Sequence, residues 1–98
     1  MIEAANHIGV LYIRVFIPQS QSLKDKRMVL KSLKDKIRNE FNASVAELDK
    51  EDKWQTATLG ACMIGPDKKY IDNALRNILS LAERHYPLEI CETVVEFC

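Results

Sequence analysis

The sequence lacks the features that most function classes require. Its 98 residues carry no net charge, because fourteen basic residues balance fourteen acidic ones. Glycine and proline number only three each, and this composition excludes a collagen-like repeat or a disordered tail. No apolar run approaches the ~20 residues that a membrane-spanning helix needs. Affinity for nucleic acid or for a membrane surface would therefore require charge segregated to one part of the chain.

The cysteines do not suggest a disulfide framework or a metal site. Cys62, Cys91 and Cys98 are odd in number and have no C-x-x-C spacing. The first seven residues lack the basic and long apolar segments of a secretory signal. We therefore expect a cytoplasmic protein whose cysteines act as small apolar side chains.

Catalytic motifs are also missing. The sequence contains no G-x-G-x-x-G and no P-loop, and neither His7 nor His85 has a partner at the spacing of a triad or a metal site. Acidic residues near a turn lack the EF-hand spacing and are expected to be solvated: Glu47, Asp49, Glu51 and Asp52. We expect no enzyme activity, no cofactor and no metal.

The pattern of apolar residues predicts six elements in the order βαββαβ. Alternating or β-branched runs predict strands over residues 8–17, 43–49, 54–64 and 88–98, with a turn at 50–53. Helical spacing predicts one helix over 23–41, capped by Ser22 and ended by Asn42. A second helix is expected to begin after Asp67 and to end at Pro87.

This order is typical of an α+β ferredoxin-like sandwich, a four-stranded antiparallel sheet with two helices on one face. Residues 1–98 form a single domain with residues 1–7 as a frayed lead, and right-handed crossovers place the first and third strands in the centre. Alternation assigns two aliphatic sets to the helix side, Leu11, Ile13, Val15 and Ile17 and then Ala57, Leu59, Ala61 and Met63.

The other sheet face is left open and partly apolar. Alternation gives it Val10, Tyr12, Arg14 and Phe16 from the first strand and Trp54, Thr56, Thr58, Cys62 and Ile64 from the third. Trp54 is expected to be half-buried. An apolar face of this kind favours self-association into a homodimer, and the alternative is a base-stacking platform like that of RNA-recognition motifs.

The first helix segregates positive charge. Residues 22–41 hold seven basic and three acidic residues, an excess of four positive charges that the rest of the chain offsets. Five cations fall in an arc of about 80° beside the core stripe: Lys24, Arg27, Lys31, Lys34 and Arg38. Neighbouring like charges repel, and cations in the first turn oppose the helix dipole, so helix stability alone does not explain them. The arc predicts binding of RNA or another anion, with an ordinary solvated face as the alternative.

Several segments resemble the YlxP-like family of small bacterial proteins of unknown function. They are residues 22–27 (SLKDKR), 29–33 (VLKSL) and 41–47 (FNASVAE), with Trp54, Ala57, Leu59 and Gly60. The resemblance implies a ferredoxin-like fold. Genes of the family often neighbour those of transcription and translation factors, which implies association with RNA or the ribosome.

Three functions remain open at this point. The first is a non-enzymatic module that binds RNA or a ribosomal particle through the first helix, without a membrane partner. The second is a homodimeric interaction module that uses the open sheet face. The third is an acylphosphatase-like hydrolase, which the sequence disfavours because residues 18–22 (PQSQS) replace the Gly-Val-Phe-Phe-Arg type loop of those enzymes.

Overall fold

The computed structural model confirms the predicted order of elements, and it describes residues 2–49 and 53–98. The elements are β1 (His7–Phe16), α1 (Leu23–Glu40), β2 (Ser44–Glu47), β3 (Thr56–Gly65), α2 (Lys68–Glu83) and β4 (Glu89–Phe97). Of the turn expected at 50–53, only Lys53 falls within the described residues.

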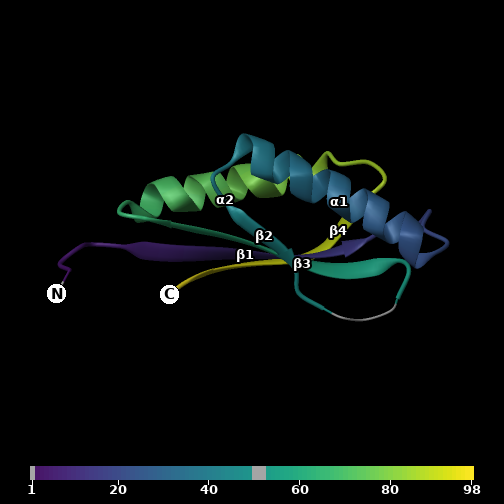
Figure 1. The fold of residues 1–98 in the computed structure, drawn as a ribbon, viewed down its shortest axis with the longest axis horizontal. Helices are drawn as coiled ribbons and strands as arrows, with labels where there is room; N and C mark the ends of the chain where they lie inside the picture. The colour runs from purple at the N-terminus through teal and green to yellow at the C-terminus, as the bar shows by residue number, and fades with distance from the viewer. Residues whose placement is uncertain (1, 50–52) are drawn as a thin grey trace.

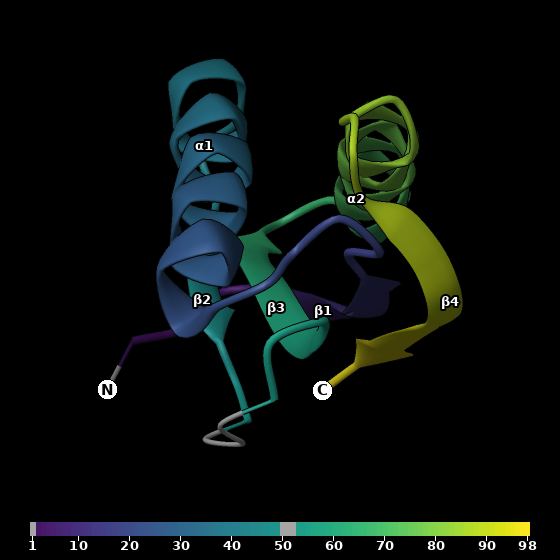
Figure 2. The same ribbon diagram turned by 90° about the vertical axis from the view of Figure 1, so that its right-hand side faces the viewer.

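The four strands form one antiparallel sheet in the order β2-β3-β1-β4. β1 and β3 are therefore central, as right-handed crossovers predict. Both helices lie on the same side of the sheet, with α1 over β2 and α2 over β1 (Figures 1 and 2). The opposite side of the sheet carries no helix.

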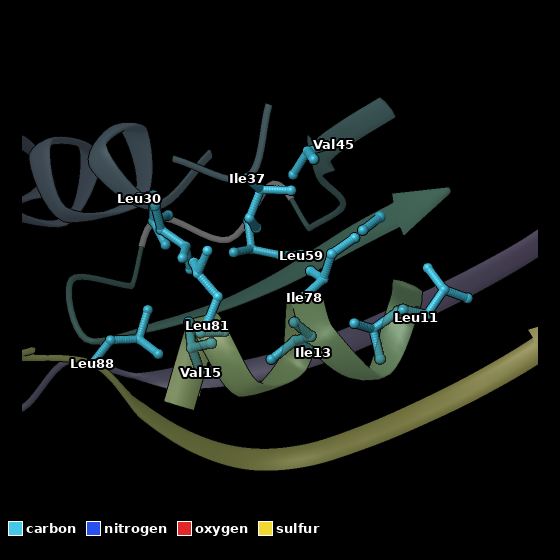
Figure 3. Close-up of a cluster of buried hydrophobic side chains, with 14 of the residues drawn as sticks. Leu11, Ile13, Val15, Leu30, Ile37, Val45, Leu59, Ile78, Leu81 and Leu88 are labelled. Atoms are coloured by element: carbon cyan, nitrogen blue, oxygen red, sulfur yellow. The ribbon is translucent and has the colours of Figure 1, made fainter. Parts of the chain in front are cut away.

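The core lies between the sheet and the two helices (Figure 3). All eight aliphatic residues that alternation assigns to this side are buried, as are six residues of α2 at helical spacing: Ile71, Ala74, Leu75, Ile78, Leu81 and Ala82. From α1 the fully buried apolar residues are Leu30, Leu33 and Ile37. Burying side chains of this size contributes about 1.5–3 kcal/mol each, so this layer supplies most of the stability.

Side chains cap both helices as the sequence predicts. The Ser22 hydroxyl accepts a hydrogen bond from the Asp25 N–H at 3.1 Å, and the Asp67 carboxylate accepts from two N–H groups of α2. The expected left-handed end at Asn42 is wrong, because no non-glycine residue of the described chain has a positive φ. Instead Phe41 ends α1 in an extended conformation and packs against the core, so the chain runs directly into β2.

Lys26 is buried, which is unusual for a lysine. The residue is 2% exposed, and its ammonium donates to the backbone carbonyls of Lys53 at 2.8 Å and Thr56 at 3.0 Å. The Glu47 carboxylate lies 3.7 Å from the same ammonium. Because a buried charge is tolerated only when it is paired and hydrogen-bonded, these contacts fix the start of α1 to the segment that leads into β3.

Replacing Lys26 with Met should lower the free energy of unfolding by about 2 kcal/mol, since the change leaves two buried carbonyls and the Glu47 carboxylate without their donor. Urea unfolding followed by far-UV circular dichroism measures this loss. Lys36→Met, on an exposed side chain of the same helix, is the matched control and should change little. Equal losses in the two variants would contradict the anchoring role.

Candidate nucleic-acid interface

The basic arc consists of Lys24, Arg27, Lys31, Lys34 and Arg38. The structure places all five on one flank of α1, beside the edge strand β2; Lys34 is half-buried and the other four are exposed. The N–H of Leu48 donates to Thr58 in β3, so strand alternation directs the backbone groups of Val45 and Glu47 towards the free edge. The arc therefore follows an open sheet edge.

Arg38 is tied to that edge. Its guanidinium donates to the Val45 carbonyl at 2.9 Å. An unpaired carbonyl on an edge strand invites pairing with another chain, and a charged side chain that occupies it blocks such pairing. Arg38 thus has a structural role, and it contributes less free charge to the arc than its position on the helix predicts.

Asp35 neutralises part of the arc. Its carboxylate accepts from the Lys31 ammonium at 2.7 Å and lies 3.9 Å from the Arg38 guanidinium. The hydrogen bond from Lys31 lowers the pKa of Asp35, and the nearby charges of Lys31, Arg38 and Lys34 lower it further. Exposed pairs of this kind contribute little to stability, but they reduce the positive potential at the middle of the arc.

Three cations of the arc are left for other partners: Lys24, Arg27 and Lys34. Within residues 2–49 and 53–98, no carboxylate forms an ion pair with any of them. They lie in a row that extends over about 15 Å, since each helical residue rises ~1.5 Å. Of the four α1 cations without an ion pair among the described residues, three therefore lie on the side that faces the β2 edge, and Lys36 lies on the opposite flank.

The flank of α1 opposite the basic arc lies beside His85. His85 lies here with Lys36, and burial of the ring lowers the pKa of His85, as does the positive charge of Lys36. A hydrogen bond to the Val29 backbone acts in the other direction and is the weakest of the three effects. His85 is therefore neutral at neutral pH and adds no charge to the helix.

The open sheet face carries the residues that alternation predicts. Tyr12 and Phe16 of β1 are half-buried, while Ile64 is 68% exposed and Val94, which pairs with Tyr12, is 43% exposed. Trp54 is 54% exposed, so close to half of its surface is covered, as expected. It lies before the first residue of β3, where no neighbouring strand covers it.

Two features of this end of the molecule escaped the sequence analysis. Phe16 and Trp54 line a cavity of about 390 Å³, which no motif indicates because its walls come from segments far apart in the chain. The burial of Lys26 did have a signal. Lys26 precedes Leu30, Leu33 and Ile37 by four, seven and eleven residues. This spacing places it on the same face of the helix, within the core stripe.

The fold places the chain in the class of ferredoxin-like α+β proteins. It resembles the de novo designed proteins Foldit4 (TM-score 0.55, 16% identity, 95% of this chain and 96% of that one) and Ferredog-Diesel (TM-score 0.55, 13% identity, 98% and 88%). At such identities these similarities show the fold alone.

The family is shown by sequence. Residues 8–95 match the family described as Protein of unknown function (DUF503), and the chain belongs to that family. It is also 28% identical over 90 residues to the uncharacterized protein YlxP of Bacillus subtilis (strain 168), covering 92% of this chain and 98% of YlxP. The resemblance to the YlxP-like family is thereby confirmed.

No helix within residues 2–49 and 53–98 is long and apolar enough to cross a membrane. No group of three or more His, Cys, Asp or Glu side chains in that part of the chain could hold a metal ion.

Removing the Lys31 ammonium should raise the pKa of Asp35 towards its ordinary value. Because this pKa is lowered in the folded protein, the Lys31–Asp35 pair stabilises the fold above the ordinary carboxyl pKa and stops doing so as the pH falls through the folded value. Carboxyl-detected NMR titration of the wild type and of Lys31→Ala measures the shift. Arg76→Ala, which breaks the Arg76–Asp72 pair on α2, should leave the pKa of Asp35 unchanged.

Proposed function

We propose that this protein is a non-enzymatic module that binds RNA, alone or in a ribosomal particle, through the basic arc of α1. The observation that supports it most strongly is the row of cations without ion pairs, Lys24, Arg27 and Lys34. Placing unpaired like charges on one helix flank costs stability, and binding to phosphates would offset that cost.

The length of the row favours a polyanion over a small anion. One phosphate group contacts one or two of these side chains, whereas a row of about 15 Å can follow several phosphates of a strand. The helix start itself is less suited to an anion, because the Asp25 carboxylate stands there and accepts from the Gln21 N–H at 3.0 Å. The arc would thus position RNA without reading its sequence.

Binding of single-stranded RNA should weaken with salt. Three neutralised phosphates give a slope of about −2 for the logarithm of affinity against the logarithm of salt concentration. The double change Arg27→Glu with Lys34→Glu should lower affinity about tenfold or more for every RNA sequence alike. Fluorescence anisotropy with labelled oligonucleotides measures both quantities.

The matched control is Lys36→Glu with Lys69→Glu. It changes the net charge by the same amount at two exposed lysines away from the arc, one on the opposite flank of α1 and one on α2. Equal losses in the two double variants would mean that overall charge, and not the arc, governs binding. No binding of the wild type at low salt would refute the proposal.

The open sheet face supports a second candidate function, a homodimeric interaction module. The strand lengths and a spacing of ~4.8 Å give a face of about 500 Å² per copy, or about 1,000 Å² in a dimer, which is at the lower limit for a specific interface. Arg14 on this face is already engaged within the chain, because its guanidinium donates to the Thr58 hydroxyl at 3.0 Å and lies 3.6 Å from the Asp49 carboxylate. The case for a dimer therefore rests on the apolar residues of the face.

Val94→Lys should weaken such a dimer, because it places a charge beside Tyr12 on the apolar face. Val95→Lys is the control, since Val95 is similarly exposed (37% against 43%) but pairs with Leu11 and so lies on the helix side of the same strand. Sedimentation equilibrium at micromolar concentration gives the outcome. A wild-type monomer at these concentrations would exclude the dimer.

A further inference from the structure

A cavity at one end of the open sheet face combines aromatic and cationic side chains. It is a shallow, open cavity of about 390 Å³, lined by Phe16 at the end of β1 and by Lys53, Trp54, Gln55 and Thr56 before and at the start of β3. The Trp54 side chain is 54% exposed, so part of its indole is accessible from solvent. An accessible indole beside a hollow offers a surface on which a flat ring can stack.

The walls of this cavity are held in place by hydrogen bonds. The Ile17 N–H donates to the Gln55 carbonyl at 2.7 Å, and the Gln55 side-chain amide donates to the Pro18 carbonyl at 3.1 Å. From the helix side, the Lys26 ammonium binds the carbonyls of Lys53 and Thr56. The segment is thus fixed at both ends, and a ligand would meet a preformed site with a small entropic cost.

The same bonds connect the cavity to the basic arc. Lys26 belongs to the first turns of α1, between Lys24 and Arg27, and it contacts two residues of the cavity wall segment. The start of α1 and the start of β3 accordingly lie at the same end of the molecule (Figure 1). The arc is on the helix side of the sheet and the cavity on the open side, so a strand whose phosphates follow the arc would reach the two aromatic rings by passing round this end of the sheet.

We propose that this cavity takes one unpaired base of a single-stranded RNA, stacked against Trp54 and Phe16, while the phosphates of that strand contact Lys24 and Arg27. This inference rests on the proposed function and adds to it the chemical class of the substrate, a single strand and not a duplex. Aromatic side chains accept any base on their faces, so the site would be tolerant of sequence.

Trp54 is the one tryptophan of the chain, so its fluorescence reports on this cavity alone. The probes are a short oligouridylate and an abasic strand with the same number of phosphates. Oligouridylate should quench the emission of Trp54, because stacking brings a base against the indole, whereas the abasic strand should bind with the same salt dependence and without quenching.

Variants separate stacking from charge. Trp54→Ala should weaken the binding of oligouridylate about tenfold and leave the binding of the abasic strand unchanged, and Trp54→Phe should restore most of the loss. Tyr70→Ala, which removes an aromatic ring of α2 that is 66% exposed, is the matched control and should bind as the wild type does. Because Trp54 is exposed, its removal should not unfold the protein, and the urea midpoint of each variant checks this.

The outcomes distinguish the two proposals. If oligouridylate binds through the arc but neither quenches Trp54 nor responds to Trp54→Ala, the cavity inference is wrong and the proposed function stands. If neither strand binds at low salt, both fail. A change of Trp54 emission with protein concentration in the absence of RNA would show that a second copy of the chain covers the cavity, and this would also overturn the inference.

Discussion

The buried ammonium of Lys26 fixes the relation between α1 and the segment before β3. It lies in the core stripe of α1, and it donates to two carbonyls where the chain enters the sheet. A charge that has left water must keep its partners, so the helix cannot slide or rotate without losing them. The position of the basic arc along the β2 edge and the shape of the Trp54 cavity both follow from this attachment.

Because both helices cover the same side of the sheet, the other side remains accessible for binding. Two helices bury the helix side of β1 and β3, and the second face keeps aromatic and aliphatic side chains in contact with solvent. The same arrangement places the charge of α1 on the outer flank, away from the apolar face. An RNA strand and a second copy of the chain would thus use adjoining surfaces, and they would compete only around Phe16 and Trp54.

The fold was predictable from the sequence because its determinants are local. Alternation along β1 and β3 specifies which face of each strand is buried, and helical spacing does the same for α2. Ser22 and Asp67 mark helix starts because their side chains accept from N–H groups only two or three residues ahead. Each of these signals involves neighbours in sequence, and the structure confirms them.

The basic arc was equally visible as a pattern, since five cations at helical spacing share a flank wherever the helix is placed. The partners of those cations could not be predicted from the sequence. Three features depend on residues up to 38 positions apart in the chain. Arg38 donates to the Val45 carbonyl, Lys26 is buried, and Trp54 and Phe16 line one cavity. The sequence by itself determined the elements, their faces and the location of the charge, because these follow from local periodicity. Only the tertiary structure decided which charges are paired and where a cavity opens, because distant segments meet only when the sheet and helices have packed.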